Sequence, residues 1–260
     1  MKTRSKQRWK RGGKIIILAF LIAFGLRLFV IESVYISTDQ MEKTYSKGDL
    51  VFISKLAYGI RVPFTSTTLL EKPVRRNDLV LFRVPQTKRD AKILSRCVGL
   101  SGDTVAIVNG RLTINGFQAT TPPTLLPICN AGKGLSKLEA YLVAESQNTK
   151  EVEQINEANP YKVVVPKAGM EVVVDLTAIQ LYESIFTDEN SDKAVIIKDN
   201  ALYIGNQKHP RYLFKENYYW VLSDNREKGV DSRGLGFISE KNIDGKALKA
   251  WFNCNFLSYE

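Results

Sequence analysis

The chain has 260 residues, 44% of them hydrophobic, and a formal net charge of +10. This length and composition can bury one large core or two small ones. A single histidine speaks against a His-dependent triad, and three cysteines without C-x-x-C spacing speak against a zinc site or a disulfide scaffold, so we expect no metal and no cofactor.

The positive charge is concentrated at the amino terminus. Residues 1–14, "MKTRSKQRWKRGGK", carry seven basic and no acidic side chains, which leaves only +3 of the net +10 for the rest of the chain. A nucleic-acid-binding domain carries its basic charge on the folded body. We therefore expect no nucleic-acid partner.

The segment after this tail is apolar. Residues 15–31, "IIILAFLIAFGLRLFVI", contain one charged side chain, Arg27, near the far end. A helix of this length extends roughly 26 Å, near the lower limit for crossing a bilayer, and an arginine near its end can reach the headgroups. A cleaved signal peptide has the same features, but no A-x-A-like cleavage site follows in "ESVYIST". We predict an uncleaved transmembrane anchor over 15–31 in contact with membrane lipid. Its basic flank places the tail (1–14) in the cytoplasm and residues 32–260 outside.

Short β patterns begin at Leu50. "DLVFISKLAYGI" alternates, whereas "NDLVLFRVP" and "AKILSRCVGLSGDTVAIV" are compact apolar runs bounded by Pro and Gly. Asn109-Gly110 in "IVNGRLTING" predicts a hairpin with a type I′ turn. Residues 195–207 repeat the pattern of residues 106–118, which predicts a second, related hairpin. The pattern predicts a mainly β fold.

The composition changes between about residues 119 and 193. Polar loop material is followed by the strand pattern "KVVVPKAGMEVVVDL" and by "LTAIQLYESIFTDEN", which has helical spacing. We interpret this region as a second lobe inserted into a β domain that spans residues 32–260.

Four segments, in this order, resemble the type I signal peptidases, which are membrane-anchored serine endopeptidases that remove signal peptides from exported proteins. The segments are "YISTDQMEKTYSKGD", "NDLVLFRVP", "ILSRCVGLSGD" and "SDNREKGVDSRGLGFISEKNIDGKAL". The resemblance implies a signal-peptidase-like β-fold and a location in the inner (cytoplasmic) membrane of a bacterium, with the main domain outside.

The resemblance breaks down at the reacting groups. The family uses a serine nucleophile and a lysine base that is neutral because apolar neighbours desolvate it. Set against the family's I-P-S-x-S-M and K-R-x-V-G segments, Gln40 stands at the nucleophile and Ser95 at the base. Gly229 replaces the serine that orients the lysine, and Ser223 replaces a glycine. Neither a glutamine amide nor a serine performs these roles near neutral pH, which implies a catalytically inactive homologue.

Other motif residues are retained. Thr38 aligns with a hydroxyl of the family's oxyanion hole, although a simple turn hydroxyl explains it equally well. Asp224 and Asn225 keep the last motif, in which Asp231 and Arg233 align with an ion pair that braces the site.

A rearranged dyad would use Ser37 and Lys92, each three positions upstream of the expected place. In an extended segment, an odd shift turns a side chain to the opposite face and moves it about 10 Å, beyond the ~3 Å reach of a nucleophile and base.

Three functions are open. We predict a protein that binds signal peptides, or supports an active signal peptidase paralogue or the export machinery, without cutting. The alternatives are an active serine endopeptidase with the rearranged dyad, and a purely structural subunit in which Gln40 fills the peptide site.

Overall fold

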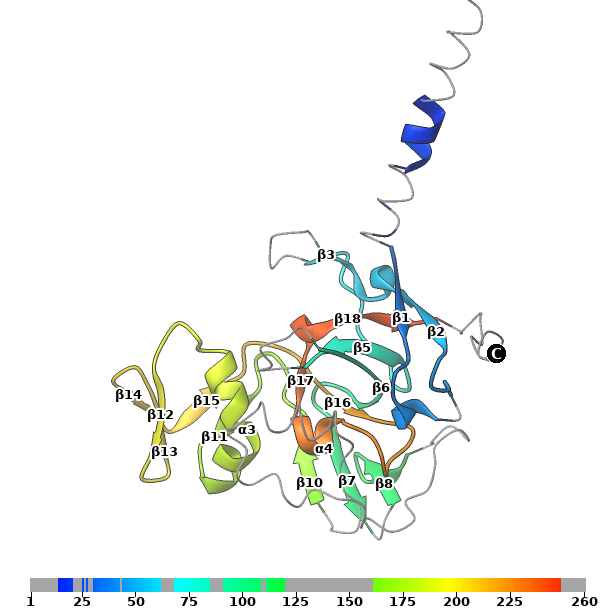
Figure 1. The fold of residues 1–260 in the computed structure, drawn as a ribbon. Coiled ribbons are helices and arrows are strands. Elements are labelled where there is room, and N and C mark those ends of the chain that lie inside the picture. Colours follow the sequence, from blue (N-terminus) through cyan, green and yellow to red (C-terminus); the bar gives the residue numbers. More distant parts are fainter. Residues whose placement is uncertain are drawn as a thin grey trace, which may run out of the picture. The chain divides into compact units, whose positions relative to one another are not determined.

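The computed structural model describes residues 14–20, 25, 27, 30–42, 44–61, 68–84, 91–108, 111–119 and 161–248 (Figure 1). The chain forms two compact units. Unit 1 comprises residues 1–35, 48–73 and 245–260, and unit 2 comprises residues 36–47 and 74–244. As predicted, the described residues are mainly β with few helices.

Unit 1 is built on an antiparallel hairpin. Strand β1 (Ile31–Tyr35) pairs with β2 (Leu50–Ser54), and the last residues of β18 (Ile243–Ala247) pair with the other edge of β2. A Cβ on Gly245 would lie 2.5 Å from the carbonyl oxygen of Ser54, so this close approach requires glycine. The remaining elements of the unit are the 3₁₀ turn η2 (Lys55–Tyr58) and the short pair β3 (Ile60–Arg61) and β4 (Thr68–Leu69).

The predicted anchor lies partly outside the described residues. Residues 14–20 are helical, with exposed side chains, and Ile31 belongs to β1, where it pairs with Ser54, instead of to the span. No helix within the described residues is both long and apolar enough to cross a bilayer. The anchor over 15–31 stays a prediction.

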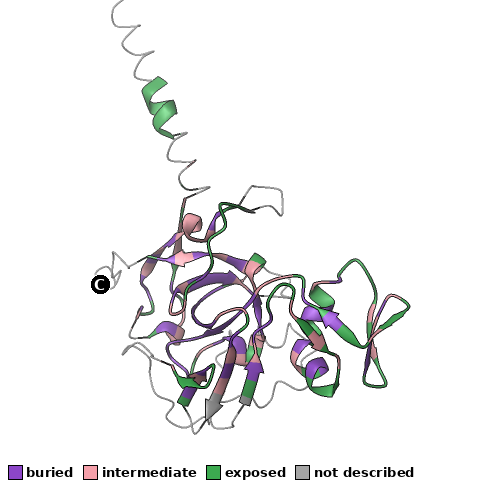
Figure 2. Cartoon of the chain, turned by 180° about the vertical axis from the view of Figure 1, so that it is seen from behind, coloured by how far each residue is buried: buried purple, intermediate pink, exposed green. Residues whose placement is uncertain are grey.

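Unit 2 contains a central antiparallel sheet with the strand order β5-β6-β16-β17. The strands are β5 (Leu79–Arg83), β6 (Lys92–Gly99), β16 (Tyr218–Leu222) and β17 (Ile238–Ser239). All residues of β16, and all of β6 after Lys92, are buried, which fits their almost continuously apolar sequences (Figure 2). Cys97 on β6 is buried, and burial raises the pKa of its thiol, as in a cysteine that acts as a small core residue.

Both predicted hairpins are present, each extended by a third strand. Strands β7 (Thr104–Val108), β8 (Arg111–Ile114) and β9 (Phe117–Gln118) form the first set, and β10 (Tyr161–Val164) pairs with the free edge of β7. Strands β12 (Val195–Lys198), β13 (Ala201–Ile204) and β14 (Gln207–His209) form the second set. In the second hairpin Asp199 and Asn200 have φ values of 51° and 57°, as a type I′ turn requires.

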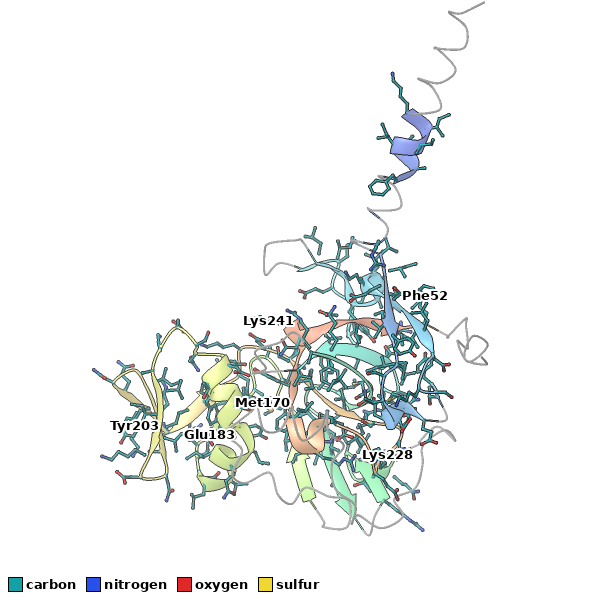
Figure 3. The ribbon with its side chains drawn as sticks, in the orientation of Figure 1. Phe52, Met170, Glu183, Tyr203, Lys228 and Lys241 are labelled. Atoms are coloured by element: carbon teal, nitrogen blue, oxygen red, sulfur yellow. The ribbon has the colours of Figure 1, made fainter. Side chains whose placement is uncertain are left out.

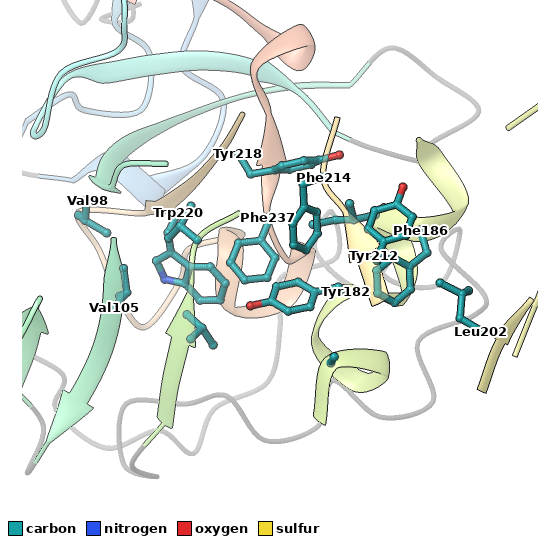
Figure 4. Close-up of a cluster of buried hydrophobic side chains, with 14 of the residues drawn as sticks. Val98, Val105, Tyr182, Phe186, Leu202, Tyr212, Phe214, Tyr218, Trp220 and Phe237 are labelled. Atoms are coloured by element: carbon teal, nitrogen blue, oxygen red, sulfur yellow. The ribbon is translucent and has the colours of Figure 1, made fainter. Parts of the chain in front are cut away.

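Helix α3 (Leu176–Asp188) confirms the helical spacing and packs into a core cluster of buried hydrophobic residues. It begins where the Asp175 side chain accepts a hydrogen bond from the Ala178 amide at 2.7 Å. Tyr182 contacts Phe237, whose ring centroid lies 5.1 Å from that of Trp220 on β16 (Figure 4). Two further strands, β11 (Glu171–Val173) and β15 (Arg211–Leu213), pair with each other beside this helix (Figure 1).

Most of the predicted inserted lobe, residues 120–160, lies outside the described residues, and the lobe stays a prediction. Its described part joins the rest of unit 2, because β10 pairs with β7 and α3 shares a core with β16. Three short helical turns complete the unit: η1 (Asp39–Met41), α4 (Ser232–Leu235) and η3 (Glu240–Asn242).

Candidate active site

All of the predicted site residues belong to unit 2. They lie just before or on η1, on β6, and on the segment that runs from the end of β16 into α4. Thr38 is extended and precedes η1, and Met41 at the end of η1 is fully buried. The carbonyl oxygen of Gln40 accepts a hydrogen bond from the Asn225 amide at 2.9 Å. This bond joins the loop at the predicted nucleophile to the last motif.

The side chain of Gln40 reaches β6 beside the predicted base position. Its Nε2 donates to the carbonyl oxygen of Leu94 at 3.3 Å, one residue before Ser95. Ser95 has no exposed surface, and its Oγ has no hydrogen-bond partner among the described residues. The two positions therefore lie close together, but they hold an amide and a buried hydroxyl.

Ser223 fills the space that a side chain at Gly229 would need. A Cβ on Gly229 would lie 2.1 Å from Cβ and 2.2 Å from Oγ of Ser223, so only one of the two positions can carry a side chain. The β16–β6 register ends at the pair Leu222–Arg96, one residue before Ser223. Compared with the family motif, the serine of this segment stands at position 223 and not at position 229.

Arg96 and Asp224 form a buried ion pair. Arg96 donates from Nε to Oδ1 at 2.7 Å and from Nη2 to Oδ2 at 2.6 Å, and the two side chains are 8% and 0% exposed. Arg96 also donates to the Asn77 carbonyl oxygen, and Thr44 donates its hydroxyl to Asp224. This two-point geometry ties β6, the η1 loop and the last motif together.

Asp231 and Arg233 form a second ion pair, with Arg233 Nη2 2.9 Å from Asp231 Oδ2. Asp231 also accepts from the Ser223 amide at 2.9 Å, and Arg233 donates to the Arg226 carbonyl oxygen at 2.8 Å. Burial lowers the pKa of the Arg226 guanidinium to about 10, although Asp231 raises it. A cation in this loop is therefore desolvated.

The outer side of the loop is polar. Asn225 Nδ2 donates to Glu42 at 3.0 Å. Lys228, which is labelled in Figure 3, lies 3.6 Å from Asp39 in an exposed ion pair. Exposed pairs of this kind contribute little to stability.

Ser37 and Lys92, the residues of the rearranged dyad, and Thr38, the oxyanion-hole candidate, stay predictions. Ser37 is exposed, and Thr38 is half-buried and makes no side-chain cap to η1. Lys92, at the exposed start of β6, forms an ion pair with Asp244 at 3.0 Å. Among the residues described, no group of acidic, Cys and His side chains is arranged to hold a metal ion.

Three features of the site did not follow from the motifs alone: the role of Arg96 as partner of Asp224, the Gln40–Leu94 contact, and the exchange between Ser223 and Gly229. The last had a signal in the sequence, because the two departures from the family pattern are opposite, a gained and a lost serine six residues apart.

The comparisons with known proteins agree with the motifs. The model of the family described as signal peptidase, peptidase S26, matches residues 9–252. Signal peptidase I of Buchnera aphidicola subsp. Schizaphis graminum is 27% identical over 252 residues, which cover 90% of this chain and 72% of that protein. Signal peptidase I of Haemophilus influenzae is 27% identical over 243 residues, covering 89% of this chain and 66% of that protein. The crystal structure of a signal peptidase I from Enterococcus faecalis V583 shares 18% identity and covers 67% of this chain and 97% of that one, with a TM-score of 0.33.

Proposed function

The chain belongs to the signal peptidase family, peptidase S26, and from this we propose that it binds signal peptides without cleaving them. The observation that carries the proposal is which residues stand at the two dyad positions. Gln40 uses its amide in a contact with Leu94, and Ser95 is a buried hydroxyl. Neither can act as a nucleophile–base pair at neutral pH.

The proposed site is a strand edge. Members of the family hold an extended peptide beside a β-strand, and main-chain hydrogen bonds supply affinity in this mode whatever groups are present for catalysis. The two ion pairs, Arg96–Asp224 and Asp231–Arg233, support this reading because they brace the same segments without using the dyad positions.

The setting we propose is a bacterial inner membrane. The basic tail of residues 1–14 and the apolar segment 15–31 support a single anchor with the amino terminus in the cytoplasm and the main domain outside. A protein held there meets signal peptides, an active signal peptidase paralogue and the export machinery, and any of these is a suitable partner.

A cleavage assay tests the proposal. The full-length chain, incubated with a synthetic signal peptide containing an A-x-A segment, should bind the peptide and release no product above background. The controls are Ser37→Ala and Lys92→Ala. Turnover that either substitution abolishes would establish the rearranged dyad in place of the proposal, and absence of both binding and cleavage would favour a purely structural subunit.

Protease accessibility tests the topology. Protease added to spheroplasts should digest the chain after Glu32 and spare the tail. Protection of the main domain, or release of a soluble form truncated near Tyr35, would contradict the proposed anchor.

A further inference from the structure

At Leu94, one edge of β6 has no neighbouring strand among the described residues. The Val84 amide donates to the Ala91 carbonyl at 2.9 Å, and the Cys97 amide donates to the Asp78 carbonyl at 2.8 Å. Because hydrogen-bonded and non-hydrogen-bonded positions alternate along an antiparallel pair, Leu94 directs its N–H and C=O away from β5.

The opposite edge is only partly covered by β16. Its register with β6 runs from Gly99 to Arg96, where Leu222 ends the strand. Within the described part of the chain, no strand pairs with Leu94 on this edge, and the carbonyl of Leu94 is bonded to the side chain of Gln40 instead. An unpaired strand edge is a template on which an extended peptide can add.

Gln40 occupies the place of such a peptide. Its Nε2 lies 3.3 Å from the Leu94 oxygen, whereas the nitrogen of a paired strand would lie about 2.9–3.0 Å from the same oxygen. The Gln40 amide therefore competes with a peptide N–H for the Leu94 oxygen. The backbone of Gln40 is meanwhile held by the amide of Asn225, so the side chain is presented to the edge by an anchored loop.

We propose that Gln40 is an intramolecular latch on the peptide site: its side-chain amide substitutes for the backbone N–H of a peptide at Leu94, and a peptide must displace it to bind. This inference rests on the proposed function. It gives the residue at the nucleophile position a regulatory role in place of a chemical one. The contact is long for an N–H···O bond, and Gln40 is only half-buried, so the side chain can move into solvent without unfolding the loop.

The test compares affinities for a fluorescein-labelled synthetic signal peptide with an A-x-A segment, measured by fluorescence anisotropy on the full-length chain. Gln40→Ala removes the latch and should tighten binding about 2- to 10-fold, the range expected when one net hydrogen bond no longer has to be broken. Gln40→Met keeps the length of the side chain but has no donor, so it separates the hydrogen bond from steric filling. Asp39→Ala, on the same turn, leaves the latch in place and should bind like the wild type.

Each outcome decides. The latch is supported if Gln40→Ala binds the peptide more tightly than the wild type does. It is also supported if Gln40→Ala binds the peptide and the wild type shows no measurable binding. Equal or weaker binding by Gln40→Ala, with a wild type that binds, overturns the latch and leaves the proposed function intact. If neither binds, the proposed function fails, and the latch fails with it because there is no ligand to exclude.

Discussion

The bracing pairs and the dyad positions are neighbours on β6 and the 223–233 loop, but they differ in how their polar groups are satisfied. Arg96 and Asp224 share two hydrogen bonds in a fully buried setting, and Asp231 is bonded by Arg233 and by a backbone amide. The Ser95 hydroxyl, one residue from Arg96, has no partner in the described part of the chain. Buried polar groups in native proteins are normally bonded, so the Ser95 hydroxyl is an exception that distinguishes the dyad positions from the ion pairs.

The difference shows that the frame and the chemistry of this site are separable. The Arg96–Asp224 pair joins residues 128 positions apart, and the Asp231–Arg233 pair holds the 223–233 loop through the Ser223 amide and the Arg226 carbonyl oxygen, so both pairs support the fold. In the function that we propose, the dyad positions are no longer needed for a reaction. A chain that no longer cuts can change the second group without losing the first. The predictions below test this separation, beginning with the frame.

The largest effect is expected from breaking the buried pair. Arg96→Met leaves the Asp224 carboxylate buried without its cation and should lower the free energy of unfolding by about 3–5 kcal/mol. The matched control is Arg211→Met, which breaks an exposed pair with Glu171 whose side chains are 65% and 51% exposed, and should cost about 1 kcal/mol or less. Denaturant unfolding measures both. Similar losses for the two variants would show that the buried pair does not hold the frame.

The next largest effect concerns the exchanged serine. Gly229→Ala places a Cβ 2.1 Å from that of Ser223 and should destabilise the chain by about 1–3 kcal/mol through overpacking. Adding Ser223→Gly should restore most of the lost stability, because it removes the side chain that the new Cβ would contact.

Gly234→Ala is the control for this pair, because a Cβ there meets no atom within 4 Å. Its unfolding midpoint should stay close to that of the wild type. Additive effects of Gly229→Ala and Ser223→Gly would contradict the exchange.

Much of the fold around the site was predictable from the sequence, because these elements depend on patterns of neighbouring residues. The Asn109-Gly110 signal and the repeat at residues 195–207 led to both hairpins, and the helical spacing after Asp175 led to α3. The motif also paired Asp231 with Arg233, two residues apart in the sequence.

Patterns of neighbouring residues could not predict the contacts at the dyad positions. The Gln40–Leu94 bond joins residues 54 positions apart, and the Arg96–Asp224 pair joins residues 128 apart. The steric conflict between Ser223 and Gly229 depends on the path of a loop. A serine introduced at position 229 alone would clash with Ser223, which the motif comparison could not show.

A smaller effect should separate two buried serines. Ser232 accepts a hydrogen bond from the Val221 amide at 2.9 Å, so Ser232→Ala should destabilise the frame by about 1–3 kcal/mol by leaving that donor unbonded. Ser95→Ala removes a hydroxyl with no partner among the described residues and should leave stability unchanged or raise it by up to about 1 kcal/mol. A clear loss of stability in Ser95→Ala would mean that the Ser95 hydroxyl has a hydrogen-bond partner. The dyad positions and the ion pairs would then differ less in how their polar groups are bonded.

The smallest expected signal, a weak gain of activity, tests whether the frame still suits the family's reaction. The variant Gln40→Ser with Ser95→Lys restores the nucleophile and the base. The introduced lysine would lie at a fully buried position beside Leu94, in a region where burial already lowers the pKa of Arg226, and desolvation should lower the pKa of its ammonium in the same direction. Gly229 is left unchanged because Ser223 occupies the space of a side chain there, so this form tests the Ser223 hydroxyl as the orienting group.

We expect the double variant to cleave an A-x-A peptide slowly, and each single variant to show no cleavage, because a nucleophile and its base act as a unit. Mass spectrometry of the products measures this. A second form that also carries Ser223→Gly and Gly229→Ser returns the hydroxyl to the family's position without a clash. Cleavage by this form alone would show that position 223 cannot replace position 229. If both forms fold and neither cleaves, positions 40 and 95 are not placed so that a serine and a lysine there can react. The retained ion pairs would then support a site suited only to binding.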